Sequence, residues 1–456
     1  PAAEGSASSV RGDFAFTVSG GREDTNGFLL DGVDNVDPKL NTPAVRPPVD
    51  AIKEFEVQTS GYEAATGRYS AGQVSVVSHS GTNALRGTAY GFFRSEALDA
   101  THVFALREGP EPEYSRRQFG GSIGGPLLRD RLFFFADYEG TRIKEGITRV
   151  TNVPTEAERR GDFSSSLLPP PINFLTGEPF PGGRLPEFML NPIGVAIANL
   201  YPLPNRDVPG ANFVSSPSLD DRNDQFDVRI DRPVGDRLDL MARYSFADRT
   251  MYEPFAGPAF TQVPGFGNTL ERRAQNAVVS ALSVLSPRLL NEARFGYTRV
   301  SAAVNQEGQG VSLNRQLGLP ELSSNPRDWG LSFITVSGFS PLGHEYNNPQ
   351  HGTTDAFQVT DTVTWSAGRH LVKAGFDLRA IRQDAFRDVQ ARGNIAFTPF
   401  AYTGNALADL LLGLPTLTVG ATTLDNPQRL RTENVGLFVQ DSWRVRPDLT
   451  LTAGLR

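Results

Sequence analysis

Cysteine is absent from the 456-residue chain, so a disulfide framework and a zinc–thiolate site are both excluded. Long apolar runs are missing as well. The longest candidate, residues 407–414, is interrupted by Asp409 and followed by Pro415, whereas a membrane-spanning helix needs about 18 apolar residues. A membrane-spanning barrel is still compatible with a mean hydropathy of −0.30, because barrel strands alternate apolar and polar residues.

Blocks of basic residues are also lacking and the net charge is −7 at pH 7, which argues against nucleic acid as a partner. No apolar leader follows Pro1, so we expect the true amino terminus and any targeting peptide to lie upstream. In contrast, the chain has 45 glycines, 33 prolines and 30 phenylalanines. This composition favours many turns and strands over helices.

From about Leu85 onward, apolar and polar residues alternate in segments that are separated by turn residues. The clearest segment is 237–248, where the even-numbered residues from Leu238 to Phe246 are all apolar. Each such segment is predicted to be a strand of an antiparallel sheet with one apolar face. A soluble sandwich shares this pattern, so alternation alone does not identify the fold.

The connections between these strands alternate strictly between short and long. The short turns are 126–130, 233–236, 286–288, 367–369 and 446–448. The long connections are 95–115, 143–223, 251–271, 301–352 and 383–428. If the strands run up and down, all short turns fall at one end, as in outer-membrane barrels with short periplasmic turns and long external loops.

The fold class that follows is all-β: about eleven strands of a large antiparallel transmembrane barrel, with a small α+β piece at the amino-terminal end. We place the barrel at residues 84–456 and the small piece at residues 1–83, with strands at 52–58 and 73–78. Because single-chain membrane barrels have even strand numbers, we expect the barrel to continue past Arg456 and to leave an unpaired edge there.

Several segments resemble TonB-dependent outer-membrane transporters. AIKEFEV at 51–57, SAGQVSVV at 70–77 and GTAYGFFR at 87–94 resemble the end of the plug and the first barrel strand of that family. FLLDGVDN at 28–35, FGGSIGGP at 119–126 and VGLFVQDSW at 435–443 resemble its Oar-like group, which carries an amino-terminal carboxypeptidase-regulatory-like domain.

The resemblance implies a location in the cell outer membrane, in contact with its lipid, and a plug inside a barrel of about 22 strands. It further implies that external loops capture a solute whose identity the sequence leaves open. Release would be driven by a TonB-type energy-coupling complex that pulls on an amino-terminal box, which is not in this chain. No cofactor is implied.

Six residues of the plug-like region are candidates for contacts with the barrel or for a moving gate: Glu54, Glu56, Gly67, Arg68, Gly72 and Gly81. The glycines permit turns that bring plug strands close to the wall. The charged residues must point into a polar lumen, since a lipid-facing charge costs about 2–4 kcal/mol at the bilayer midplane. We favour structural contacts over gating.

A loop of the plug-like region concentrates carboxylates: Asp31, Gly32, Asp34, Asn35 and Asp37. Hard oxygen ligands of this kind can bind calcium. The loop lacks the spacing and the terminal Glu of an EF-hand, so we favour Asx turns that cap the loop.

Four further motifs have an ordinary structural explanation that we favour. The G-x-S-x-G match at 120–124 lacks the helix that a nucleophilic Ser122 requires, so glycine-relieved strand packing explains it better. His344, Glu345 and His351 are more consistent with a solvated loop than with a metal site. Residues 406–414 are predicted to form a short amphipathic helix, and residues 167–209 a folded excursion of an external loop.

Trp365 and Trp443 each precede a short turn, where aromatic residues of the inner membrane interface are expected. The function hypothesis is a solute transporter without catalytic residues. The main alternative is a surface receptor or adhesin on the same scaffold, in which the loops bind a partner and nothing is imported. An outer-membrane hydrolase that depends on Ser122 is the third class.

Overall fold

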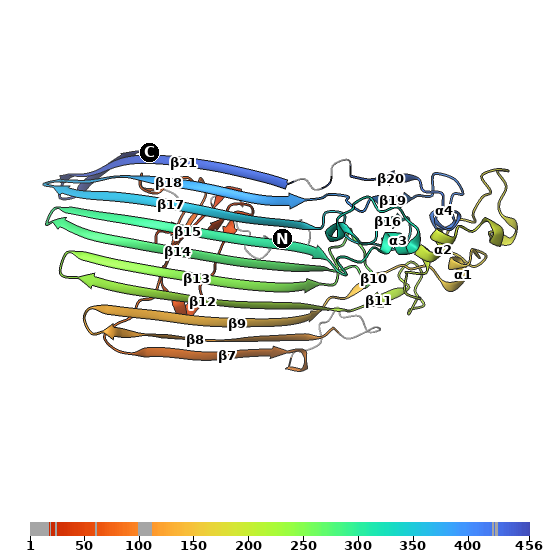
Figure 1. The fold of residues 1–456 in the computed structure, drawn as a ribbon, viewed down its shortest axis with the longest axis horizontal. Coiled ribbons are helices and arrows are strands. Elements are labelled where there is room, and N and C mark those ends of the chain that lie inside the picture. Colours follow the sequence, from red (N-terminus) through yellow and green to blue (C-terminus); the bar gives the residue numbers. More distant parts are fainter. Residues whose placement is uncertain are drawn as a thin grey trace.

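The computed structural model describes residues 18, 20–22, 25–59, 62–98, 112–421, 424 and 427–456. Its main feature is an 11-stranded antiparallel sheet, here called the wall, in which every strand pairs with the next wall strand along the chain (Figure 1). The wall strands are β7 (Arg86–Ser95), β8 (Tyr114–Leu128), β9 (Leu132–Gly146), β12 (Ser218–Val234), β13 (Leu238–Glu253), β14 (Asn268–Ser286), β15 (Leu289–Gln306), β17 (Gln350–Ala367), β18 (His370–Arg387), β21 (Pro427–Arg446) and β22 (Leu449–Leu455). The expected strand number and all five short turns are confirmed.

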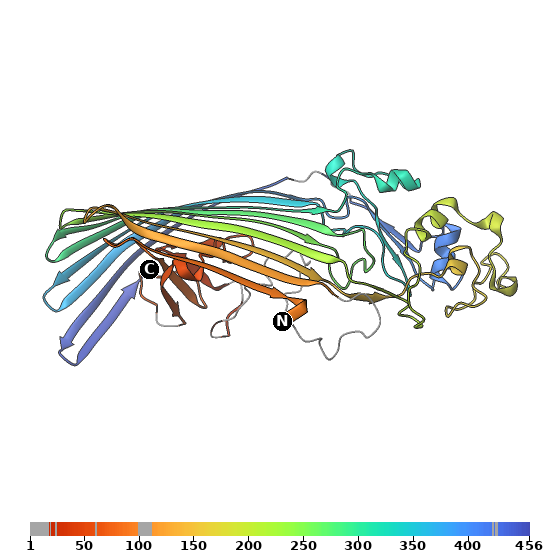
Figure 2. The ribbon, with the colours of Figure 1, turned by 90° about the horizontal axis from the view of Figure 1, so that it is seen from below.

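The wall curves into a partial barrel whose two edges are β7 and β22 (Figure 2). Its convex, outward face is apolar over much of its length, with Val279 54% exposed and Val435 73% exposed. Its concave, inward face is polar, and Arg243 and Asn276 are almost completely buried there. This is the arrangement that a barrel wall between lipid and a polar lumen requires.

The strands are longer than the sequence indicated, and the long connections are correspondingly shorter. The connection expected at 143–223, for example, runs only from 147 to 217. A membrane strand needs about 9–11 residues, whereas β12 has 17 and β21 has 20. The strands are therefore longer than a bilayer crossing requires. Residues 99–111 of the connection expected at 95–115 lie outside the described residues.

The N-terminal unit, residues 25–78, lies on the concave side of the wall (Figure 2). Its four-stranded sheet has the order β2-β1-β6-β5, with β1 (Gly27–Leu30) parallel to β6 (Gln73–Ser78). The other strands are β2 (Val33–Asp34) and β5 (Ile52–Gln58), and a separate pair is formed by β3 (Val36–Asp37) and β4 (Thr42–Pro43). The predicted bounds of β5 and β6 are confirmed. A 3-10 turn, η3 (Val49–Ala51), precedes β5.

The long connections pack together into a loop head, residues 147–217, 254–267, 307–349 and 388–421, at one end of the wall (Figure 1). It contains α1 (Glu156–Arg159), α2 (Pro192–Ala198), α3 (Leu313–Leu317), α4 (Ala406–Leu412), the pair β10 (Arg149–Thr151) and β11 (Phe213–Ser215), and the sheet β16 (Phe333–Val336), β19 (Asn394–Phe397) and β20 (Leu417–Val419). Short 3-10 turns are η5 (Pro181–Gly183), η6 (Glu187–Met189) and η7 (Pro326–Asp328), while η4 (Glu96–Leu98) follows β7. No helix among the described residues is both long and apolar enough to cross a membrane.

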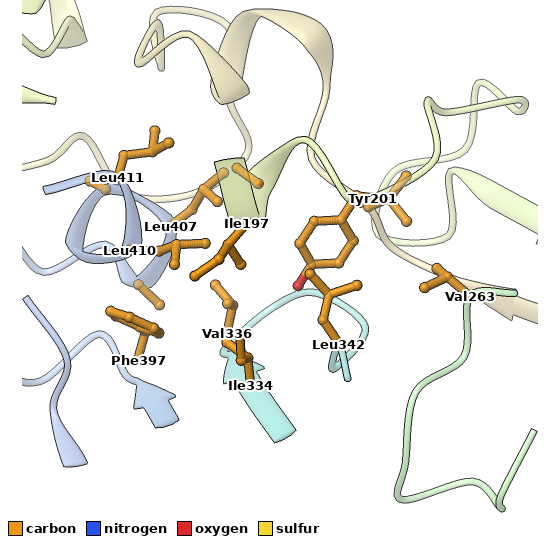
Figure 3. Packing of buried hydrophobic residues seen from close by; sticks show 14 of the residues in the cluster. Ile197, Tyr201, Val263, Ile334, Val336, Leu342, Phe397, Leu407, Leu410 and Leu411 are labelled. Atoms are coloured by element: carbon orange, nitrogen blue, oxygen red, sulfur yellow. The ribbon is translucent and has the colours of Figure 1, made fainter. Parts of the chain in front are cut away.

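One hydrophobic core unites residues from four connections in the loop head (Figure 3). Tyr201, Val263, Leu342 and Leu410 come from different connections and are all nearly inaccessible to solvent. The predicted helix at 406–414 is present as α4, between an Asn405 N-cap and a left-handed Gly413. It is enclosed on nearly all sides rather than amphipathic, because every residue from 406 to 411 is buried.

Candidate functional site

The N-terminal unit meets the inward face of the wall through the hairpin that joins β1 to β2. Asp31 and Gly32 form its two-residue turn and have positive φ angles of 49° and 79°. An Asp-Gly pair suits such a turn, because glycine and aspartate tolerate left-handed backbone better than other residues. The turn presents the Asp31 carboxylate to β12 and β13.

Asp31 is held by two arginines of the wall and by its own unit. Arg243 Nε donates to Asp31 Oδ2 at 2.7 Å, and Arg229 Nη1 lies 3.4 Å from Oδ1. The Ser78 amide and hydroxyl donate to the same carboxylate at 2.9 and 2.8 Å. The side chains of Asp31 and Arg243 are 2% and 0% exposed, so this ion pair is fully removed from water.

Asp34 forms the second buried contact, with β18. Arg379 Nη1 donates to Asp34 Oδ2 at 2.8 Å, while Arg68 and the Tyr69 hydroxyl bind the same carboxylate from within the unit at 3.2 and 2.7 Å. Arg379 is also held by Asp377, with its Nη2 donating to Oδ2 at 3.0 Å. The Arg379 guanidinium group is therefore held both by Asp34 of the unit and by Asp377 of the wall.

The wall also recognises the backbone of the hairpin. Gln358 Oε1 accepts the Asp34 amide at 2.8 Å, while Thr298 Oγ1 and Asn276 Nδ2 donate to the Asp34 carbonyl at 2.9 and 3.1 Å. Arg272 donates to the carbonyl of Ala44 at 3.0 Å. Every wall strand from β12 to β18 in the sheet order thus contributes at least one inward side chain to this contact.

The expected Asx turn is present at Asp37, whose Oδ1 accepts the Lys39 amide at 3.0 Å. At Asp31 and Asp34 the expectation is wrong, because their carboxylates bind arginines of the wall instead. A buried carboxylate is costly unless a cation pairs with it, and turn amides alone do not supply that charge. Asn35 supports the loop differently: it bonds both the amide and the carbonyl of Val45, at 3.0 and 2.8 Å.

Three glycines lie where a Cβ would come close to a neighbouring atom. A Cβ on Gly81 would lie 2.3 Å from the Phe134 carbonyl oxygen of the wall, so this link to β7 passes directly against the wall backbone. A Cβ on Gly67 would meet the Arg456 side chain, and one on Gly72 would meet Val18. Gly81 thus makes the predicted close approach to the wall. Its φ angle is not positive, so the backbone conformation there does not itself require glycine.

Glu54 and Glu56 lie apart from this contact. Both are exposed on β5, and Glu56 accepts a hydrogen bond from Gln58 at 3.0 Å. Neither forms an ion pair with any residue that the structure describes. Arg68, by contrast, joins the Asp34 cluster.

Sequence reasoning missed the wall side of the site. Arg229, Arg243 and Arg379 lie on the polar face of alternating strands, which is the face that carries the contacts. Nothing local marks these three among the other polar residues of that face. One signal could have indicated these ion pairs: the wall has basic residues at inward positions, and the N-terminal unit has a carboxylate-rich hairpin.

The predicted solvated loop at His344 and Glu345 is wrong, because both residues are buried in the loop head, at 2% and 1% exposure. Burial lowers the pKa of His344 to about 3 and raises the pKa of Glu345 above its usual value. His344 Nδ1 accepts the Leu331 amide at 3.0 Å, so the ring acts as a neutral acceptor. His351 lies on β17 against Phe386, and no cluster of three or more metal-ligating side chains occurs in the described residues.

The loop head contains a mostly apolar cavity of about 420 Å³ between α2, α4, β19 and β20. Ile193, Leu322, Ile395 and Leu410 contribute apolar groups to its lining. Asn394 adds a polar group, and its side-chain oxygen is buried without a hydrogen-bond partner among the described residues. Such a pocket can accept a small ligand that offers a hydrogen-bond donor.

The remaining predicted positions have structural explanations. Ser122 lies inside β8 and bonds Thr88 at 2.8 Å, so the G-x-S-x-G match forms no nucleophile elbow. Trp365 and Trp443 lie on the outward face near short turns and are 50% and 42% exposed. Their role at the membrane interface stays a prediction.

A family model described as an outer membrane beta barrel domain matches residues 77–456. The chain belongs to this family. This member of the barrel family is 23% identical to the TonB-dependent transporter Oar of Myxococcus xanthus over 492 residues, covering 97% of this chain and 43% of Oar. It therefore spans less than half the length of that relative. Barrel-family membership places the chain in the outer membrane.

Solved structures show the same fold as this barrel-family chain. The outer membrane transporter YddB from Escherichia coli matches with a TM-score of 0.55 and 11% identity, over 96% of this chain and 49% of YddB. A mutant of the ferric enterobactin receptor PfeA from Pseudomonas aeruginosa matches with a TM-score of 0.50 and 12% identity, over 96% of this chain and 50% of PfeA. These relatives are transporters and receptors, not enzymes.

Proposed function

We propose that the chain is part of a TonB-dependent outer-membrane transporter. Residues 1–83 form the carboxyl-terminal part of its plug, and residues 84–456 form the first part of its barrel. The loop head binds a scarce solute from outside. A TonB-type energy-coupling complex, acting through a segment outside this chain, then detaches the plug from the wall and opens a polar path.

The observation that supports this proposal is the chemistry of the contact between the N-terminal unit and the wall. Asp31 and Asp34 are bound by arginines from strands on both sides of the hairpin, at 2.7 and 2.8 Å. Buried ion pairs of this kind fix one position of the unit, since each charge lacks a partner in any other position. A plug must have this property to block a lumen at rest.

The cavity in the loop head supports solute binding outside the membrane. It lies among connections that the barrel does not need for closure, and its lining includes the Asn394 side-chain oxygen, which has no hydrogen-bond partner within the described part of the chain. Loops that rest on a rigid scaffold are common positions for binding sites.

A removable tether between plug and wall tests the proposal. An ideal Cβ at Gly296 of β15 would lie 2.9 Å from the Cβ of Val33, and disulfides join Cβ atoms about 3.8 Å apart. A small displacement therefore admits a disulfide in the Val33→Cys/Gly296→Cys variant, which oxidises in the cell envelope. Cells of the source bacterium would carry the intact gene, a deletion or this variant, each single-cysteine variant serving as a control.

The readout is mass spectrometry of the culture medium for compounds whose depletion depends on the gene. We expect at least one such compound, with depletion lost in the oxidised double variant and restored by reductant. If the oxidised tether leaves depletion unchanged, plug movement is not part of uptake. If no compound depends on the gene but attachment of cells to surfaces does, the adhesin alternative is correct. Phe188 and Phe400 of the loop head, 89% and 92% exposed, favour that second candidate.

A further inference from the structure

Two carboxyl groups oppose each other on the inward face of the wall, beside the Asp31 contact. Asp137 of β9 is directly opposite Asp227 of β12 in the strand register, and the two residues are 6% and 4% exposed. Their side chains lie within hydrogen-bonding reach of each other. Neither carboxylate oxygen of Asp137 has a hydrogen-bond donor among the described residues, and both oxygens are buried. An ionised Asp137 would therefore be a buried charge without compensation.

A proton is the ligand that this carboxyl pair can hold. Ionised carboxylates only accept hydrogen bonds, so two of them at this separation repel each other and cannot bond. One proton removes the conflict, because a protonated carboxyl group donates to its ionised neighbour. A bound metal ion needs more ligands than two carboxylates, and the described part of the chain contains no group of three metal-ligating side chains.

The charged groups around the pair do not supply a cation for Asp137. The titratable and charged residues that face it from the wall and from the side of the N-terminal unit are Tyr90, Glu139, Arg229, Arg243, Asp31, Asp50 and His79. Both arginines in this set already contact Asp31. Glu139 carries the same charge as Asp137 and adds repulsion. The surroundings therefore favour a neutral Asp137.

Hydrogen bonds join the carboxyl pair to the unit. Arg243 Nε donates to Asp31 at 2.7 Å, and Arg243 Nη1 donates to Ser245 Oγ at 2.5 Å. The Ser245 hydroxyl in turn donates to Asp227. When the unit detaches, Asp31 leaves, so the positive charge of Arg243 acts on the carboxyl pair alone and water enters the site. Both changes favour the ionised form of Asp137.

We propose that Asp137 and Asp227 share one proton while the unit is attached, and that this proton passes to water in the lumen when the unit detaches. The release step rests on the plug role proposed above, whereas the shared proton does not. The attached state then binds one more proton than the detached state. A rise in pH therefore favours detachment, by up to about tenfold per pH unit.

Infrared difference spectroscopy of the intact protein in detergent micelles tests the shared proton. Asp137→Asn keeps the shape of the side chain, and its amide can donate to Asp227. At neutral pH, the wild-type spectrum minus that of this variant should contain the C=O band of a protonated carboxyl group. The matched control is Asp224→Asn, which removes an outward carboxylate of β12 that binds Arg142 at 2.8 Å.

The control difference spectrum should lack this band. If the band is also missing for Asp137→Asn, no proton is shared and the proposal is wrong. If Asp137→Asn does not fold, Asp227→Asn replaces it, because an ionised Asp137 would then accept from the new amide and the same band should be lost. Persistence of the band in Asp227→Asn would equally refute the proposal.

Cysteine labelling tests the release step. Val33 is 1% exposed and packs against Gly296 of the wall, so a Val33→Cys side chain reacts with a maleimide only after detachment. The labelling rate is measured between about pH 6 and pH 9. Dividing it by the rate of the urea-unfolded protein at the same pH removes the ionisation of the thiol itself.

We expect this relative rate to rise with pH in the otherwise unchanged protein and in the Asp224→Asn background, and to be independent of pH in the Asp137→Asn background. An equal pH dependence with and without Asp137→Asn would refute the release of the proton. If no labelling occurs at any pH, the unit does not detach, so the plug role and the release step both fail. The infrared band still decides in that case whether the proton is shared.

Discussion

Replacement of Arg243 by Gln tests whether buried ion pairs hold the N-terminal unit against the inward face of the wall. The Arg243 side chain is fully buried, and its Nε donates to Asp31 at 2.7 Å. Removing one partner of a buried pair costs about 3–5 kcal/mol. Asp31 keeps its bonds to Ser78 and a longer contact to Arg229, so we expect the lower end of that range. A loss of about 3 kcal/mol raises the detached population on the order of 100-fold.

The absence of cysteine from this chain provides the assay. Val33 follows the Asp31–Gly32 turn, is 1% exposed and packs against Gly296 of the wall. A Val33→Cys side chain reacts with a water-soluble maleimide only when the unit detaches. If detachment and return are fast relative to the reaction, the labelling rate is proportional to the detached population. We expect labelling on the order of 100-fold faster when Arg243→Gln is added.

The control for this measurement is Arg273→Gln, because Arg273 pairs with Asp248 at 2.9 Å on the outward face of the wall. This variant also removes an arginine and an ion pair, but none that touches the unit. It should change labelling of Val33→Cys by less than threefold. An effect below threefold for Arg243→Gln, or an equal effect for both variants, would refute the role assigned to the buried ion pairs.

Three further predictions concern packing and protonation. Gly81→Ala places a Cβ 2.3 Å from the Phe134 carbonyl oxygen and should destabilise the intact protein by about 1–3 kcal/mol in thermal unfolding, whereas Gly91→Ala, with open space around it, should not. Leu410→Ala should cost the loop head about 2–5 kcal/mol and speed its proteolysis, with Leu167→Ala, 76% exposed, as the neutral control. Burial lowers the pKa of His344 to about 3, so its contribution to stability is complete above about pH 6.5 and is lost as the pH falls towards 3. Between pH 7 and pH 5 the wild-type protein should therefore lose on the order of 2 kcal/mol more unfolding free energy than the His344→Asn variant, as measured by thermal unfolding. An equal pH dependence of the two proteins would contradict this.

The wall could be predicted from the sequence because lipid imposes a strict pattern on it. Within the bilayer, outward residues must be apolar and inward residues polar, so alternation identifies each strand. The same reasoning misplaced the strand ends. Lys144 on β9, for example, is paired with Asp220 close to the loop head, where both faces of a strand meet water and alternation is lost. Polar residues there were interpreted as loop although they continue the ladder.

The contact between the unit and the wall could not be predicted in the same way. Asp31 and Arg243 are 212 residues apart, and no local pattern records which inward residue faces which residue of a separate unit. The loop head shows the same limit at His344 and Glu345. Their polar sequence context indicated solvent, but burial there is decided by packing among four connections.

The plug role that we propose would explain why this contact uses charges although apolar packing of equal size is often as stable. An apolar contact would expose apolar surface to the lumen on separation, and the free-energy cost would grow with the exposed area. Charged groups such as Asp34 and Arg379 regain water when they separate into a polar lumen, which recovers part of the cost of breaking the pair. The apolar part of the contact consists of two clusters: Leu30 and Val45 meet Ala247, Ala274 and Val300 of the wall, and Leu40 packs against Met251, Leu270 and Val304. The contact therefore fixes the position of the unit on the wall and limits the free energy needed to separate the two.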